Sequence, residues 1–180
     1  MPGARYGDSD CYISLLGNPH CTAVSAFESD KEELNDFLAK DALGYQNLNL
    51  GATYLLFSKE GNRLISYITL SMGALKIPEG DEFEFRGKRL KEYPKEFPRN
   101  FPALLIGKLA TDKREETRGG ASLLLAYAAS KALQMQNEIG CAYLMAHVYT
   151  DKIEWYMHKG FRTFIADPSK METVPMYIEL

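Results

Sequence analysis

The sequence has few of the features that mark membrane, secreted or disulfide-linked proteins. No uninterrupted apolar run approaches the roughly 18–20 residues that a transmembrane helix needs, and the first residues hold no apolar segment followed by a cleavage site. Only three cysteines occur, and none has the CxxC spacing. This argues against a disulfide framework and fits a reducing cytosol. We therefore predict a cytoplasmic protein without a membrane partner.

A strong charge of one sign, a metal-ligand cluster and a catalytic serine motif are also missing. The 21 basic and 24 acidic side chains give a net charge of −3, which argues against a general polyanion-binding surface. No histidine, cysteine or carboxylate cluster has metal-ligand spacing, so no metal is expected. No Gly-x-Ser-x-Gly motif or P-loop occurs either. The 180 residues, 46% of them hydrophobic, instead suit one α/β domain over residues 1–180.

The hydrophobic pattern predicts strands and helices around one long polar insertion. Ser29 or Asp30 can cap the first helix, whose apolar residues then recur at helical spacing. Residues 78–102 hold six acidic and six basic side chains among prolines, which predicts a polar surface loop. The other expected elements are a strand at 21–27, a hairpin of strands at 52–58 and 63–72, a strand at 103–110, a helix at 121–136, a strand at 141–148, a helix at 151–159, and strands at 161–166 and 174–180.

A turn with two glycines joins the buried strand at 103–110 to the long helix. Gly119 and Gly120 would let an anion approach the backbone, and the first N–H groups of a helix have no intrahelical acceptor. Arg118 adds a positive charge and Ser122 a hydroxyl group. The turn therefore suits a phosphate or pyrophosphate. The alternative is that the glycines only reverse the chain and that Arg118 is solvated.

Three segments resemble motifs of the Gcn5-related N-acetyltransferase superfamily. The family's acetyl-CoA loop, Q/R-x-x-G-x-G/A, corresponds to ETRGGA at 116–121, and its later FYek-GF signature corresponds to WYMHKGF at 155–161. The strand before the loop matches LATD at 109–112. With the order of elements, the resemblance covers nearly the whole chain, from about residue 21 to residue 180. It implies an α/β fold with a central mixed sheet of about six to seven strands, splayed central strands and about four flanking helices.

The resemblance also implies an acetyltransferase with acetyl-CoA as co-substrate. The backbone amide of Thr111 would stabilise the oxyanion, and Tyr156 would protonate the departing sulfur. On spacing alone, without the motif, the simpler interpretation of Tyr156 is a packed aromatic residue with its hydroxyl in water. Glu116 stands where the family has Gln or Arg and would repel a pyrophosphate, although Arg114 and Arg118 could offset this. The residues implied to bind acetyl-CoA are Leu109, Ala110, Thr111, Thr117, Arg118, Gly119, Gly120, Ala121 and Ser122.

The general base and the acceptor stay open at this stage. His147, a carboxylate or an ordered water are candidates for the base. We expect an N-acetyltransferase acting on a primary amine of a small-molecule or peptidyl acceptor. The alternative is a toxin-type enzyme acting on aminoacyl-tRNA, which the acidic charge balance disfavours. A second alternative is a non-catalytic acetyl-CoA-binding module. The apolar segment at 174–178 could pair with a second copy to form a homodimer.

Overall fold

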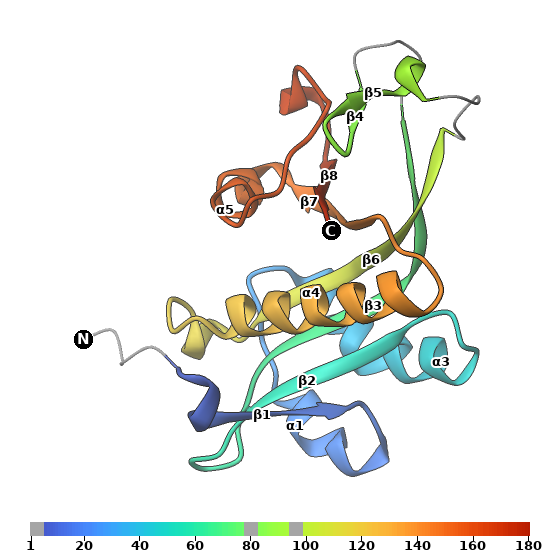
Figure 1. The fold of residues 1–180 in the computed structure, drawn as a ribbon. Coiled ribbons are helices and arrows are strands. Elements are labelled where there is room, and N and C mark those ends of the chain that lie inside the picture. Colours follow the sequence, from blue (N-terminus) through green and yellow to red (C-terminus); the bar gives the residue numbers. More distant parts are fainter. Residues whose placement is uncertain (1–5, 78–82, 94–98) are drawn as a thin grey trace. The chain divides into compact units, whose positions relative to one another are not determined.

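Six strands of the protein form one sheet, and two short strands form a separate hairpin (Figure 1). The computed structural model describes residues 6–77, 83–93 and 99–180. The strand order in the large sheet is β1-β2-β3-β6-β7-β8, while β4 pairs with β5. The strands are β1 (Cys11–Leu15), β2 (Ala52–Ser58), β3 (Leu64–Lys76), β4 (Glu84–Phe85), β5 (Lys88–Arg89), β6 (Asn100–Thr111), β7 (Tyr143–Tyr149) and β8 (Thr173–Glu179). The helices are α1 (Cys21–Ser25), α2 (Glu32–Asp36), α3 (Ala42–Asn47), α4 (Gly120–Glu138) and α5 (Ile153–His158).

The contacts divide the chain into two compact units. Unit 1 comprises residues 1–71 and 106–131, and unit 2 comprises residues 72–105 and 132–180. Both β3 and β6 therefore contribute residues to each unit. The mixed sheet with flanking helices confirms the predicted α/β fold class. The extent of a single domain over residues 1–180 stays a prediction.

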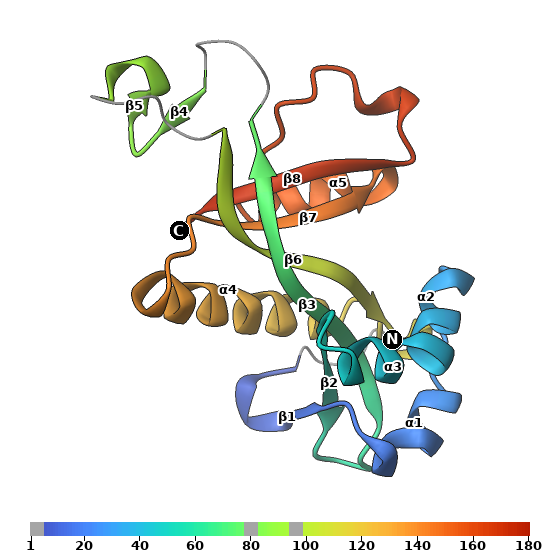
Figure 2. The same cartoon turned by 90° about the vertical axis from the view of Figure 1, so that its right-hand side faces the viewer.

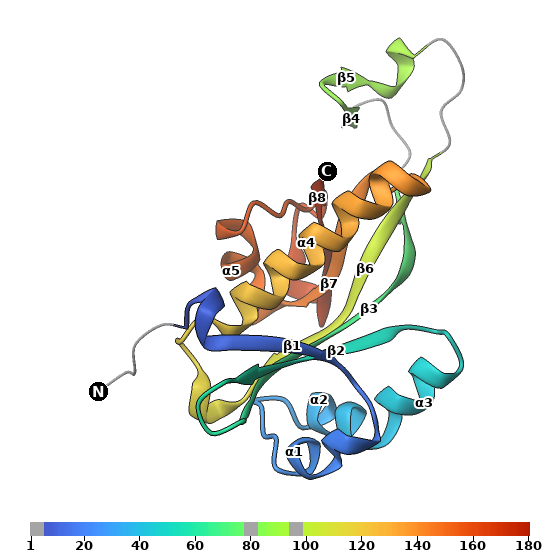
Figure 3. The same ribbon diagram turned by 60° about the horizontal axis from the view of Figure 1, so that its bottom comes forward.

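Unit 1 is built on an antiparallel meander of β1, β2 and the first part of β3. Helices α1, α2 and α3 lie on one side of β1 and β2, and the first turns of α4 lie on the other side (Figure 3). Leu55, Ile65 and Ile68 are fully buried between these layers. Tyr67 is also fully buried, and its hydroxyl donates a hydrogen bond of 2.8 Å to the carbonyl of Leu34. The polar end of this core tyrosine is thereby satisfied.

Unit 2 contains the antiparallel pair β7 and β8, with α5 next to β7 (Figure 2). Its core is rich in aromatic side chains. Phe101 and Tyr143 are buried, and Phe83, Phe85 and Tyr177 pack against them. The ring centroids of Phe101 and Tyr143 are 5.7 Å apart in an edge-to-face arrangement, as aromatic pairs prefer. The β4–β5 hairpin joins this core through Phe85.

Two predicted strands are wrong, and one strand of the large sheet and the short β4–β5 hairpin inside the predicted loop were missed. Residues 21–25 form helix α1, because the turn at Asn18–His20 leads directly into it and the Ser25 hydroxyl bonds to the Cys21 carbonyl one turn back. Residues 161–166 make only an isolated bridge between Arg162 and Tyr177. The missed strand is β1, which pairs along its whole length with β2.

Other boundaries shift for local reasons. The residue that caps α2 is Lys31 rather than Ser29 or Asp30. The Ser29 hydroxyl instead donates to the Asn35 side chain and to the Lys31 carbonyl. Strand β6 begins at Asn100 and therefore includes the end of the predicted insertion. The part of that insertion at 78–82 and 94–98 lies outside the described residues.

Candidate active site

The end of β6 is fixed by a buried carboxylate. Asp112 is fully buried and accepts hydrogen bonds of 2.7 and 2.6 Å from the Arg114 guanidinium. Its carboxylate also accepts the backbone N–H groups of Glu28 and Arg114. Burial alone would raise the pKa of Asp112, but the hydrogen bonds from Arg114 and Glu28 outweigh it and lower the pKa. Arg114 additionally donates to the Ala26 carbonyl at 2.7 Å, so its guanidinium anchors the strand end.

A second buried carboxylate lies one turn further on. Glu115 is 3% exposed, and its two oxygens accept from three side chains. Oε2 accepts from the Tyr6 hydroxyl at 2.6 Å and from Arg118 Nη1 at 2.8 Å. Oε1 lies 3.0 Å from Arg63 Nη2. Two cations and a phenol therefore compensate the desolvation of this carboxylate.

The two glycines of the turn have different roles. Gly119 has φ +93°, and a β-carbon built there would meet nothing within 4 Å. Gly120 has no such space, because a β-carbon would come within 2.5 Å of Ser66 Oγ and 2.7 Å of Ile65 Cγ2. Gly120 thus allows the start of α4 to pack closely on β3, and Gly119 leaves open backbone beside it. The prediction of a glycine turn at a helix start is confirmed.

The start of α4 presents backbone donors. The first backbone hydrogen bond of the helix runs from the Leu123 N–H to the Gly119 carbonyl at 3.1 Å. The N–H groups of Gly120, Ala121 and Ser122 precede it and have no acceptor within the helix. Ala121 and Ser122 are partly exposed. The positive end of the dipole of this 19-residue helix and its unbonded amides therefore lie at the turn.

The strand residues before the turn are less open. Ala110 is buried, and Leu109 and Thr111 are partly exposed. The Thr111 hydroxyl shares a hydrogen bond of 2.9 Å with the Ser66 hydroxyl. This pairing ties the end of β6 to β3 within unit 1. Thr111 through Ser122 thus form one continuous segment of that unit.

The charges around the turn differ from expectation. Arg114 was expected to offset the carboxylate of Glu116, but its guanidinium is bound to Asp112 and Ala26. Arg118 binds Glu115 and lies over the Tyr6 ring, with its guanidinium carbon 4.0 Å from the ring centroid. The Glu116 side chain is exposed to solvent. In water, its repulsion of a nearby anion is weakened by screening.

Tyr156 lies in unit 2, near the end of α5. It is 8% exposed, and its ring packs edge-on against Trp155 and Phe161, with centroids 4.9 and 5.2 Å away. Burial raises the pKa of Tyr156 above its ordinary value, so the phenol stays protonated and can act only as a proton donor. Gly160, with φ +89°, ends the helix, and its missing side chain leaves room for Ile178.

Unit 2 also contains two histidines and one cysteine. His147 and His158 are exposed, on β7 and at the end of α5. Cys141 is buried, and burial raises the pKa of its thiol, as for an unreactive core cysteine. Within the described residues, no group of three or more histidine, cysteine or carboxylate side chains could hold a metal ion. The same residues contain no helix long and apolar enough to cross a bilayer.

Sequence reasoning missed the residues that support the turn from outside the motif. Tyr6 contacts Glu115 across a separation of 109 residues, and Arg63 and Ser66 come from β3 or the turn before it. No local pattern marks such long-range partners. The composition of the 111–122 segment, which holds three acidic and three basic residues, was a weak signal that buried ion pairs are present.

The strand order and the glycine turn at the start of α4 fit the fold that the motifs predicted, and comparisons with known proteins agree on that fold. No model of a known protein family matches the chain. A curated relative, a tRNA-acetylating toxin of Mycobacterium tuberculosis (strain ATCC 25618 / H37Rv), is 26% identical over 146 residues, which cover 81% of each chain.

Three solved structures match nearly the whole chain. A tyrosine-to-phenylalanine mutant of KacT has a TM-score of 0.75 at 20% identity, covering 94% of this chain and 95% of that one. AtaT complexed with acetyl-methionyl-tRNAfMet has a TM-score of 0.74 at 19% identity, with the same coverage. A tyrosine-to-phenylalanine mutant of AtaT, bound to the C-terminus of the antitoxin AtaR and acetyl-CoA, has a TM-score of 0.70 at 19% identity, covering 94% and 93%.

These comparisons confirm the fold and the class that the motifs predicted. The chain has the fold of the Gcn5-related N-acetyltransferases, and it resembles the branch that includes the tRNA-acetylating toxins. The class of enzyme expected from the motifs, an acyltransferase, agrees with these relatives.

Proposed function

We propose that this protein transfers the acetyl group of acetyl-CoA to the α-amino group of an aminoacyl-tRNA. The observation that carries the acetyl-CoA half is the start of α4, where an open backbone at Gly119 adjoins three helix amides without intrahelical acceptors. The acceptor half rests on the likeness to tRNA-acetylating toxins over most of the chain. This acceptor replaces the small-molecule or peptidyl amine that the charge balance favoured.

The turn fits the pyrophosphate of acetyl-CoA. We propose that the amides of Gly119, Gly120, Ala121 and Ser122 bind its oxygens, with the Ser122 hydroxyl as a further donor. Thr117 and Arg118 shape the loop, and Leu109, Ala110 and Thr111 would pair with the pantetheine as an added strand does. Gly119 is the position where an added side chain would fill the space for the anion.

The proposed reaction is a direct transfer. The neutral amine adds to the thioester carbonyl, and the Thr111 N–H would hold the negative oxygen that develops there. When the C–S bond breaks, the sulfur leaves with the electron pair and takes a proton, for which we propose Tyr156. The amine loses one proton to a base or to water, so the protons balance. A tyrosine hydroxyl is protonated at neutral pH, and burial of Tyr156 raises its pKa further.

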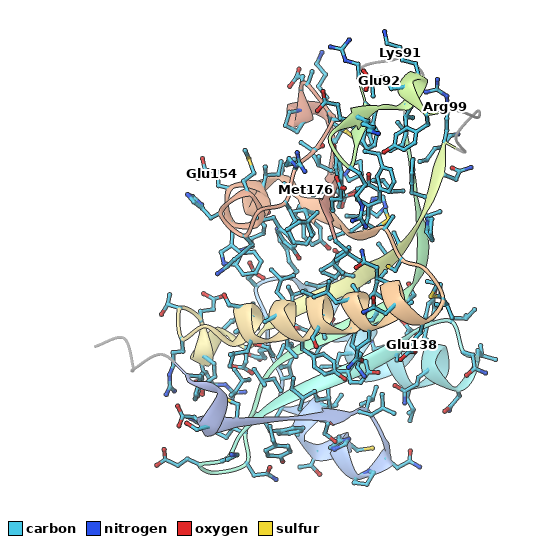
Figure 4. The ribbon with its side chains drawn as sticks, in the orientation of Figure 1. Lys91, Glu92, Arg99, Glu138, Glu154 and Met176 are labelled. Carbon is cyan, nitrogen blue, oxygen red and sulfur yellow. The ribbon has the colours of Figure 1, made fainter. Side chains whose placement is uncertain are left out.

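The described part of the polar insertion is compatible with a nucleic-acid acceptor. Residues 83–93 and 99–102 carry five basic and two acidic side chains, all of them exposed. Lys91 and Glu92 follow the β4–β5 hairpin, and Arg99 directly precedes β6 (Figure 4). The equal numbers of acidic and basic residues at 78–102, which argued against tRNA, include residues outside the described ones. Exposed basic side chains of this kind can bind phosphates.

The first experiment is a calorimetric titration with acetyl-CoA. We compare the wild type with Gly119→Glu and with Gly87→Glu, a control glycine that has a positive φ of 71° and equally open surroundings. Binding lost in Gly119→Glu and kept in Gly87→Glu supports the turn as the pyrophosphate site. No binding by the wild type at millimolar acetyl-CoA contradicts the proposal and favours a protein without this co-substrate.

The second experiment tests turnover and the acceptor. The wild type and Tyr156→Phe are incubated with radiolabelled acetyl-CoA and either aminoacyl-tRNA or the corresponding free amino acid amide. We expect label on the tRNA only, and a rate at least about 100-fold lower in Tyr156→Phe with acetyl-CoA affinity unchanged. Label on the free amine alone would restore the small-molecule acceptor. Binding without label on either acceptor would identify a non-catalytic module.

A further inference from the structure

The loop before α4 contains a backbone conformation that its own sequence does not favour. Thr117 has φ +68°, in the left-handed region. Threonine is branched at its β-carbon, so this conformation is strained, and such strain persists only where neighbouring contacts impose it. The chain could have placed a glycine or asparagine at this position without strain. The contacts that impose the conformation therefore indicate what holds the loop in shape.

Those contacts come from the N-terminal segment. The Tyr6 N–H donates to the Arg118 carbonyl at 2.9 Å, which fixes the main chain directly after Thr117. The Tyr6 hydroxyl donates to Glu115, two residues before the strained Thr117. The Arg118 side chain closes the arrangement, because it binds the same Glu115 oxygen and lies over the Tyr6 ring. One residue thus contacts the loop on both sides of Thr117.

We propose that Tyr6 is a positioning residue that holds the acetyl-CoA loop in its binding shape through Glu115 and Arg118. This inference rests on the proposed function, since it presumes that the loop binds the pyrophosphate. Tyr6 itself would touch no part of acetyl-CoA. Tyr6 would keep the Gly119 backbone and the first amides of α4 in the orientation that binds the pyrophosphate. Because these groups are already ordered, binding does not have to order them.

The contacts of Tyr6 with Glu115 and Arg118 suit this role. Burial and the hydrogen bond to Glu115 raise the pKa of Tyr6 to about 12, so the phenol is a donor throughout the neutral range. The hydrogen bond is charge-assisted, and the guanidinium over the ring adds a cation–π contact. Because Glu115 is almost completely buried, its partners cannot be exchanged for water at little cost.

The test compares acetyl-CoA with a ligand that lacks its pyrophosphate and the adenosine 3′-phosphate joined to it. Acetyl-CoA carries these groups, whereas S-acetylpantetheine shares its thioester and pantetheine and lacks them. We expect Tyr6→Phe to raise the dissociation constant for acetyl-CoA about threefold and Tyr6→Ala about tenfold, as one and then both side-chain contacts are lost. The dissociation constant for S-acetylpantetheine, followed by NMR titration, should stay within about twofold of the wild type.

A matched control and a rescue sharpen the result. Tyr93→Phe removes a tyrosine hydroxyl that donates 2.7 Å to the Phe85 carbonyl in unit 2, and it should change neither dissociation constant. Thr117→Gly removes the strain, so adding it to Tyr6→Ala should recover most of the lost affinity for acetyl-CoA. A tyrosine that only stabilises the fold would give no such recovery.

Three results would overturn the inference. Tyr6 variants that bind acetyl-CoA like the wild type would show that the contacts of the Tyr6 side chain are unnecessary for binding. Equal weakening for both ligands, with a lowered melting temperature, would show a structural role only. Both of these results leave the proposed function intact, provided that the wild type binds acetyl-CoA and Gly119→Glu does not. If the wild type does not bind acetyl-CoA at all, the proposed function fails first and this inference fails with it.

Discussion

The end of β6 in unit 1 and the aromatic core of unit 2 differ in whether their buried polar groups have hydrogen-bond partners. In unit 1, the carboxylates of Asp112 and Glu115 are buried, and each is surrounded by donors. In unit 2, Tyr143 is 1% exposed, and its hydroxyl has no hydrogen-bond partner among the described residues. A buried polar group without a partner destabilises a protein, whereas a satisfied network fixes a unique geometry.

This difference indicates where precise geometry is required. The carboxylates lie directly before the turn that we propose binds acetyl-CoA, and they hold the residues that lead into it. The aromatic cluster gains its stability from apolar area and ring packing, so one unpaired hydroxyl is tolerated. Mutations should therefore have large effects at the β6 end and small effects at Tyr143.

The largest effect is expected for Asp112→Ala. The variant leaves the Glu28 N–H without its acceptor and frees the Arg114 guanidinium, which is itself largely exposed. We expect a loss of about 2–3 kcal/mol in the free energy of unfolding, measured by urea titration. Asp36→Ala is the control, because Asp36 forms an exposed ion pair with Lys40, and it should cost below about 0.5 kcal/mol. Equal losses in the two variants would contradict the comparison.

The wild type and Asp112→Ala should also differ in how their stability depends on pH. The pKa of folded Asp112 is lowered from its ordinary value of 3.8, so its stabilising contribution is fully present above that value. The contribution is lost as the pH falls through the lowered pKa, because the carboxylate then takes up a proton. The stability gap between the wild type and Asp112→Ala should therefore be constant near neutral pH and narrow below about pH 4. A gap that widens on acidification would contradict this sign.

A medium effect is expected at the glycines. Gly120→Ala would drive a β-carbon into Ser66 and Ile65 and should cost about 1–3 kcal/mol. Gly119→Ala and Gly140→Ala, with φ of +93° and +89° and open surroundings, meet only the left-handed strain of about 1 kcal/mol. Thermal unfolding of the three variants measures the difference. If Gly119→Ala costs as much as Gly120→Ala, the space beside Gly119 is not open in solution.

Some features of unit 1 could be predicted from the sequence, and others could not. The glycine turn and the long helix after it follow from local composition, because two glycines followed by an alanine- and leucine-rich stretch favour few other structures. The strand at 21–27 was mistaken, since its short apolar pattern also suits a helix and the preceding turn decides between them. Tyr6 could not be linked to Glu115, because only the folded chain brings residues 109 positions apart together. Local pattern thus identifies the glycine turn that we propose binds an anion, and tertiary contacts identify what supports it.

The smallest effect is expected at two core tyrosines that differ in one hydrogen bond. Tyr67 and Tyr143 are both almost completely buried, but only Tyr67 has an acceptor, the Leu34 carbonyl. Tyr67→Phe removes this buried hydrogen bond, although the Leu34 carbonyl still accepts from the Phe37 N–H, and should destabilise unit 1 by about 1 kcal/mol. Tyr143→Phe removes a buried hydroxyl that bonds to nothing described, so stability should stay equal or rise by up to about 1 kcal/mol. Urea titrations of both variants test this, and a loss in Tyr143→Phe as large as that in Tyr67→Phe would mean that the Tyr143 hydroxyl is hydrogen-bonded in solution.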